Sequence, residues 1–220
     1  TPADLGKAEG LVVGGLGADS TKDLLLRMSL DMLGHTYKYV TGYRGSNAAR
    51  LALQQGEINF YSESPPSYRA LVEPGIVQKG QAIGVFYDPS WDGKVFGKSK
   101  QVDGLPMGTF LELYRQIKGG EPKGPLFEHY KTLLAINGGL FRIAVLPPGA
   151  PKAAVDAMRA AFTRLGRDKE FAEESMKAFS YVPEFDAGPD TNERVRPALV
   201  TSAEMKSFVA EYVKAGANMK

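Results

Sequence analysis

The sequence contains no cysteine, which excludes disulfide bonds, thiolate metal sites and cysteine nucleophiles. Histidine is also scarce: the chain has only His35 and His129, so we expect surface or capping roles for them and no zinc site. No apolar run approaches the roughly 20 residues of a membrane-spanning helix. The 27 basic and 25 acidic residues are interspersed, so no basic face predicts nucleic-acid binding. We therefore expect no metal, no cofactor and no nucleic-acid partner.

The known enzyme motifs are missing as well. Residues 15–20 read GLGADS, which is one glycine short of the dinucleotide-binding fingerprint, and no acidic residue ends the next predicted strand. The chain contains neither a GxxxxGK[ST] phosphate loop nor a GxSxG nucleophile elbow. These absences favour a protein that is not an enzyme, although a nucleotide-binding enzyme domain remains as an alternative.

The stretch from residue 11 to residue 34 organises the predicted fold. An apolar strand at 11–13 leads into the glycine loop 14–17, and the residues after the loop begin a long helix that Gly34 ends. On that helix Asp23, Arg27 and Asp31 form one polar stripe, and the remaining positions are mostly leucine and methionine. A strand, a glycine loop and a helix start together present free backbone N–H groups to an anion.

The same alternation continues along the first half of the chain. Strand patterns at 37–41, 58–61 and 81–87 alternate with helix patterns at 46–56 and 64–72. This order predicts an α/β fold: a parallel sheet with helices on both faces and ligands beyond the carboxyl ends of the strands.

The second half is predicted to be mainly helical. We expect the segment 89–104 to be a surface excursion in which Trp91 is a packing anchor. The patterns predict helices at 107–117, 125–137 and 151–166, a short helix from 168, a last helix opened by 201–204, and strands at 141–146 and 181–185.

Three blocks of the sequence carry a resemblance to a known family. They are GGLGADSTKDLLLRMSLDMLG (14–34), YKYVTGYRGSNAARLALQQGEINF (37–60) and FRIAVLPPGAPKAAVDAMRAAF (141–162). Their order and spacing are similar to the tripartite tricarboxylate transporter (TctC/Bug) family of periplasmic solute-binding proteins.

The resemblance implies a type 2 periplasmic-binding-protein fold, in which two lobes hold the ligand between them. Residues 8–140 correspond to the second, ligand-binding lobe, and residues 141–220 to the segment that returns to the first lobe. Family members carry a further strand–glycine loop–helix lobe before this point, so the resemblance implies a fragment with an incomplete first lobe. Because such a fragment exposes apolar surface, we expect it to rearrange or self-associate.

The resemblance also implies ligand-binding residues in the glycine loop. It carries over to Gly17, Ala18, Ser20 and Thr21, whose backbone N–H groups and hydroxyls would bind a carboxylate of the ligand. Asp19 stands in the same loop and either competes for those N–H groups or contacts a hydroxyl or amine of the ligand. The alternative is that residues 19–21 simply cap the helix, as they do in many strand–helix units.

Two neighbouring loops supply further candidates. Arg44 could pair with a carboxylate or be merely solvated, and the polar residues after the third strand could face the ligand or cap the next helix. The candidates are Tyr43, Arg44 and Ser46 in the second loop, and Ser62, Glu63 and Ser64 in the third.

The sequence and the resemblance together predict a periplasmic solute-binding protein. It would capture a mono-, di- or tricarboxylate and deliver it to the membrane subunits of a tripartite tricarboxylate-type transporter. Besides the nucleotide-binding alternative, an extracytoplasmic sensing lobe that reports ligand occupancy to a signalling partner also remains open.

Overall fold

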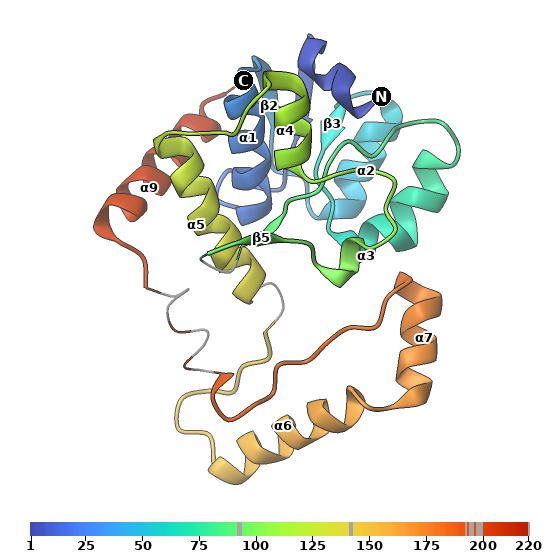
Figure 1. Cartoon of the computed structure of the whole chain (residues 1–220), viewed down its shortest axis with the longest axis vertical. Coiled ribbons are helices and arrows are strands. Elements are labelled where there is room, and N and C mark those ends of the chain that lie inside the picture. Colours follow the sequence, from blue (N-terminus) through green and yellow to red (C-terminus); the bar gives the residue numbers. More distant parts are fainter. Residues whose placement is uncertain (92–93, 141–142, 192, 194–195, 197–199, 220) are drawn as a thin grey trace.

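The computed structural model describes residues 1–91, 94–140, 143–191, 193, 196 and 200–219. Its centre is a parallel sheet of three strands, β1 (Leu11–Gly14), β2 (Tyr37–Val40) and β3 (Phe60–Tyr61), in the order β2-β1-β3 (Figure 1). Val13 lies opposite Tyr39 of β2 and Phe60 of β3. The mixed α/β class with a small parallel sheet is therefore confirmed.

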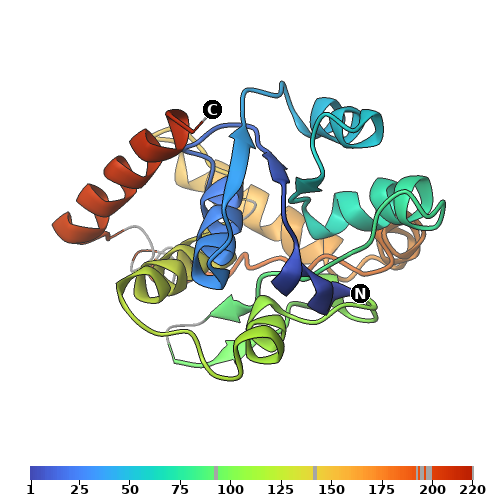
Figure 2. The same ribbon diagram turned by 90° about the horizontal axis from the view of Figure 1, so that it is seen from above.

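Helices α1 (Thr21–Leu33) and α2 (Ser46–Gln55) connect these strands, as the alternation predicted. Helices α5 and α9 lie on the side of α1, whereas α2 lies on the opposite side of the strands (Figure 2). Gly34 and Gly56 end α1 and α2 in the left-handed conformation, with φ of 78° and 77°. The residue that precedes α2 is Gly45, so neither Ser46 nor Asn47 is its N-cap.

The polar stripe of α1 is buried instead of facing solvent. Asp23 and Arg27 are each 1% exposed: Asp23 faces the glycine loop and Tyr39, and the C-terminal helix α9 (Ala203–Ala217) covers Arg27. The Arg27 guanidinium donates to the backbone oxygen of Tyr212 at 3.0 Å and lies 4.3 Å from the centre of the Tyr212 ring. The hydroxyls of Tyr212 and Tyr37 both donate to Asp31, the third member of the stripe.

The predicted strand at 81–87 does not form, and this prediction was wrong. The short helix α3 (Pro65–Ser67) continues into a π-type helix, η2 (Tyr68–Val77), and residues 82–86 have no regular secondary structure. The ladder contact of Tyr87 is a single parallel bridge to Thr109. An extended segment counts as a strand only where a neighbour pairs with its backbone, and residues 82–86 have no such neighbour among the described residues.

The predicted helices of the middle segment are present. Helix α4 (Phe110–Lys118) begins with a capping box between Thr109 and Glu112, and α5 (Pro125–Leu140) packs along α1. Trp91 stacks on Phe96 with ring centres 4.4 Å apart, which agrees with a packing role. The remaining elements here are η1 (Pro2–Lys7), β4 (Ser90–Trp91), β5 (Phe96–Gly97) and η3 (Lys100–Val102).

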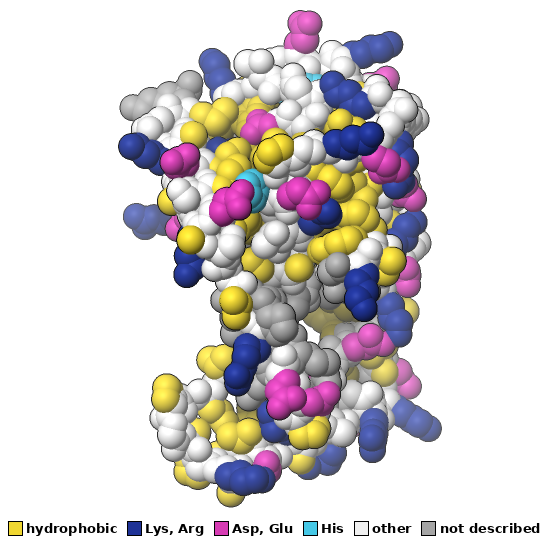
Figure 3. Space-filling view, turned by 60° about the vertical axis from the view of Figure 1, so that its left-hand side comes forward, with side chains coloured by type: hydrophobic (Ala, Val, Ile, Leu, Met, Phe, Trp, Pro, Cys, Tyr) yellow, Lys and Arg dark blue, Asp and Glu magenta, His cyan; other side chains and the backbone are white. Residues whose placement is uncertain are grey.

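Helices α6 (Lys152–Leu165) and α7 (Lys169–Phe179) form an arm that stands apart from the sheet, at the end of the molecule opposite both termini (Figure 1). No described residue of α6 is buried, and hydrophobic side chains lie on the surface of the arm (Figure 3). Phe162 of α6 and Phe171 of α7 contact Phe185, with ring centres 5.2 and 5.7 Å away.

The strands predicted at 141–146 and 181–185 do not form among the described residues. Residues 141 and 142 lie outside the described part of the chain, and residues 143–146 and 181–185 are irregular. Both segments have strand-forming compositions but no paired neighbour strand, so tertiary context overrides their propensity.

The contact between α9 and α1 predicts that two glycine-to-alanine substitutions change the free energy of unfolding in opposite directions. A methyl group at Gly216 would lie 2.1 Å from Nη1 of Arg27, so Gly216→Ala should displace α9 and lower the free energy of unfolding by about 1–3 kcal/mol. Gly138 of α5 has open space around it, so Gly138→Ala should instead raise that free energy by roughly 0.5–1 kcal/mol. Urea denaturation measures both, and equal stabilisation by the two substitutions would contradict this packing.

Candidate functional site

The glycine loop after β1 is held by a buried carboxylate from the first turn of α1. Oδ2 of Asp23 accepts hydrogen bonds from the Gly17 amide and from the Tyr39 hydroxyl, each at 2.9 Å. A Cβ atom at Gly15 would lie 2.4 Å from this oxygen, so only glycine fits there. The Gly17 N–H is therefore already bonded within the chain, and the Ala18 side chain is buried beside it.

The next residues of the loop lie closer to solvent. Asp19 is exposed and forms no hydrogen bond or ion pair with a described residue, so it does not occupy the amides of the loop. Ser20 is the N-cap of α1, but its hydroxyl makes no capping bond. The first intrahelical bond runs from the Leu24 amide to the Ser20 oxygen, so the amides of Thr21 and Lys22 precede the helical ladder.

The second candidate loop lies mostly at the surface. Arg44 is exposed, and it pairs with no carboxylate in the described part of the chain. The Tyr43 hydroxyl donates to Glu57 at 3.4 Å in an exposed position. Ser46 differs from both, because its hydroxyl lies beside the Tyr61 hydroxyl at the end of β3.

The third loop, after β3, is the most enclosed of the three. Glu63 forms an ion pair with Arg50 at 2.5 Å, and their side chains are 6% and 11% exposed. Its other oxygen accepts from the Ser64 amide, and the Ser64 hydroxyl donates to Ser67. The Ser64 hydroxyl thus bonds to the side chain of the last residue of α3 instead of capping the helix backbone.

Lys22 joins the first and third loops, and sequence reasoning missed it. Its ammonium donates to the Tyr61 hydroxyl at 3.0 Å and to the Ser62 backbone oxygen at 2.8 Å. It forms no ion pair with any described carboxylate, and burial lowers the pKa of Lys22 below its ordinary value of 10.5. Burial raises the pKa of Tyr61 to about 12, so Tyr61 is a neutral hydroxyl. The signal was present in the sequence, since Lys22 comes after Ser20 and Thr21 at the second helical position.

This cluster forms the polar end of a cavity of about 920 Å³. Lys22, Arg50, Tyr61 and residues 62–64 line this end, and mainly apolar residues line the remainder. Among the predicted site residues, Ser62, Glu63 and Ser64 therefore border the cavity. Gly17, Ala18, Asp19, Ser20, Thr21, Tyr43, Arg44 and Ser46 are not part of its lining.

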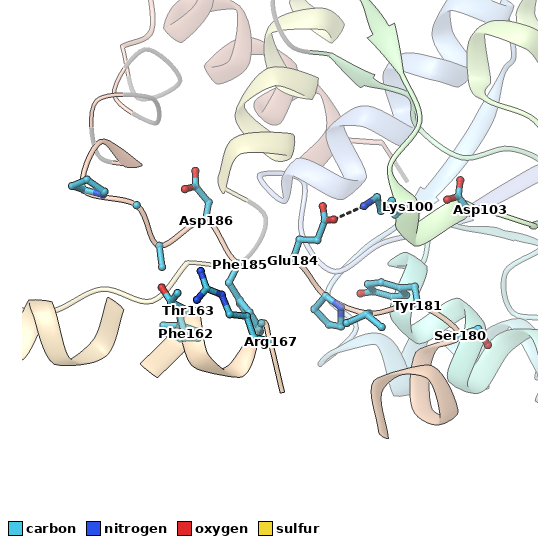
Figure 4. A pocket seen from close by; sticks show the side chains of 16 residues that line it. Lys100, Asp103, Phe162, Thr163, Arg167, Ser180, Tyr181, Glu184, Phe185 and Asp186 are labelled. Atoms are coloured by element: carbon cyan, nitrogen blue, oxygen red, sulfur yellow. Dashed lines mark hydrogen bonds and ion pairs between the residues drawn. The ribbon is translucent and has the colours of Figure 1, made fainter. Parts of the chain in front are cut away.

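A second cavity, of about 860 Å³, lies between the α6–α7 arm and the body of the molecule (Figure 4). Lys100 and Glu184 form an ion pair across it, but their side chains are 70% and 72% exposed. Exposed pairs of this kind contribute about 1 kcal/mol or less, and the Arg167 side chain on the arm is also solvent-exposed. We therefore place the candidate site at Lys22, where the charged groups are more buried.

Neither histidine lies at this site. The His129 ring stacks on Phe208 with centres 3.8 Å apart, and burial lowers the pKa of His35.

Among the described residues, no group of three or more histidine, aspartate and glutamate side chains is arranged to hold a metal ion. None of the described helices combines the length and the apolar character needed to cross a membrane.

Comparison with protein-family models, curated proteins and solved structures found no match.

The loop geometry predicts that two tyrosine-to-phenylalanine substitutions lower the free energy of unfolding by different amounts. Tyr39→Phe removes a buried hydrogen bond to the Asp23 carboxylate and should lower the free energy of unfolding by about 1.5–3 kcal/mol. Tyr43→Phe removes the exposed 3.4 Å contact and should change it by less than about 0.5 kcal/mol. Urea denaturation of the two variants tests this difference. Similar losses of unfolding free energy would show that the hydrogen bond between Tyr39 and Asp23 does not stabilise the fold.

Proposed function

We propose that this chain binds a small organic acid at the polar end of the 920 Å³ cavity, beside the N-terminus of α1. The observation that carries the proposal is Lys22, a partly buried ammonium whose two bonds go to neutral oxygens. An ammonium carries three donors, so one N–H remains for a ligand oxygen. Asp23 and Glu63 lie near enough to act on Lys22 electrostatically, but neither forms an ion pair with it, so a ligand carboxylate would be its direct ionic partner.

The surroundings of Lys22 favour an anion over a cation or a neutral ligand. The amides of Thr21 and Lys22 stand at the positive end of the α1 dipole, which stabilises an anion by about 0.3–1 kcal/mol. Each hydrogen bond between a charged group and the ligand adds about 1.5–3 kcal/mol. The Tyr61 hydroxyl, which lines the cavity at the end of β3, can bond to a further oxygen of the ligand.

We further propose that the chain is part of a periplasmic solute-binding protein of the tripartite tricarboxylate transporter family. The resemblance in residues 14–34, 37–60 and 141–162 supports this assignment, and the parallel sheet that presents its loops at one edge is compatible with it. In this proposal the ligand is a mono-, di- or tricarboxylate, no reaction is catalysed, and the partners are the membrane subunits of the transporter. The α6–α7 arm then belongs to an incomplete first lobe of a type 2 periplasmic-binding fold.

The test compares two substitutions of basic residues in neighbouring loops. Lys22→Met should weaken the binding of succinate, citrate or benzoate by about 10- to 100-fold, because it removes a charge-assisted hydrogen bond. Arg44→Met is the matched control and should change affinity by about twofold or less, because Arg44 is exposed. Isothermal titration calorimetry measures both variants, with inorganic phosphate as a further ligand. Tight phosphate binding without carboxylate binding would favour the nucleotide alternative.

The affinity should also depend on pH through the same lysine. A carboxylate binds the protonated form of Lys22, so affinity should fall as the pH rises through the lowered pKa of that group, below the ordinary 10.5. Lys22→Met should lose this dependence while the unmodified protein keeps it. A carboxylate affinity that is identical in the two proteins across this range would remove Lys22 from the site.

A further inference from the structure

The free edge of the sheet lies beside a second unpaired segment. β3 pairs with β1 on one side, and its other edge has no ladder partner among the described residues. Residues 82–86 have no regular secondary structure and make no backbone hydrogen bond to any described residue. Residues 58–65 and 81–90 line the same cavity of about 920 Å³. Two backbones with unused hydrogen-bonding groups thus border one space.

The walls of this space are apolar beyond the Lys22 end. Ile58, Phe60, Val85 and Phe86 contribute to its lining, and the Phe60 and Phe86 rings lie 6.5 Å apart. Ile83 lines it as well, although its side chain is 58% exposed. A groove with apolar walls and an open strand edge is suited to an extended apolar segment that adds to the sheet.

The chain itself carries a segment of that chemistry in an exposed position. Ile143, Val145 and Leu146 are 60%, 79% and 41% exposed, and the backbone of 143–146 makes no hydrogen bond to a described residue. Isoleucine and valine favour strands, and Pro147 restricts Leu146 to extended conformations. None of residues 143–146 lines this cavity in its own copy.

We infer that two copies of this chain form a dimer in which residues 143–146 of each copy add as a strand beside β3 of the other. The segment supplies the backbone partner that β3 and residues 82–86 lack, and its apolar side chains cover Phe60 and Ile83. Because each copy carries both a groove and a segment, the exchange is reciprocal and closes with two-fold symmetry. This inference does not depend on the proposed ligand or on the assignment to a transporter family.

The first test compares two valines of nearly equal exposure. Val145 is 79% exposed and Val200 is 77% exposed, so each accepts lysine without disturbing a core. Light scattering of the unmodified protein and of Val200→Lys should give twice the monomer mass, and Val145→Lys should give the monomer mass. A monomeric unmodified protein, or a dimer that survives Val145→Lys, would overturn the inference.

The second test uses the absence of native cysteine. Equal amounts of the single variants Ile83→Cys and Val145→Cys are mixed and oxidised gently. A disulfide between the two different variants is expected, since only contact between copies can form it. Met158→Cys, at an α6 position that is 44% exposed, replaces Ile83→Cys as the control and should form far less cross-link with Val145→Cys.

The double variant, with Ile83→Cys and Val145→Cys in one chain, completes this test. It should form disulfide-linked dimers. A disulfide within one chain, in a particle of monomer mass, would show that the segment fills its own groove and would overturn the exchange. A large open-ended aggregate in place of a dimer would overturn the two-fold closure.

Discussion

The buried carboxylate of Asp23 connects the glycine loop, the sheet and the first helix. It accepts the Gly17 amide from the loop and the Tyr39 hydroxyl from β2, and it belongs to the first turn of α1. One turn later Arg27, equally buried, lies 5.1 Å from the Tyr39 ring and bonds to Tyr212 of α9. Because burying a charge is costly unless hydrogen bonds satisfy it, these contacts restrict where the loop and α9 can lie.

This internal carboxylate also decides where an external anion can bind. Successive residues of a helix point about 100° apart, so Asp23 faces the loop while its neighbour Lys22 faces the end of β3. The Gly17 amide is bonded within the chain, whereas the Lys22 ammonium bonds only to neutral oxygens of Tyr61 and Ser62. The site that we propose for an anion therefore lies a few residues away from the predicted glycine loop, toward Tyr61 and Ser62.

Strand-forming segments without partners are a second feature of the molecule. Residues 82–86 and 143–146 both have strand compositions, and neither has a ladder partner in the described chain. The α6 helix likewise has an apolar spacing with no buried residue. Unpaired backbone and exposed apolar side chains of this kind favour association between chains.

The sequence by itself determined the local elements. The strands at β1 and β2, the helices α1, α2, α4, α5, α6, α7 and α9, and the glycine ends of α1 and α2 result from short-range periodicity and capping. It did not decide which strand patterns would pair, because pairing depends on neighbours distant in the chain. It also did not reveal that Asp23 and Arg27 are buried or that Lys22 faces a cavity, because a charged residue on a helix is usually solvated. Only the tertiary structure, by placing α9 and the end of β3 against α1, decided that Arg27 is enclosed and that Lys22 borders a cavity.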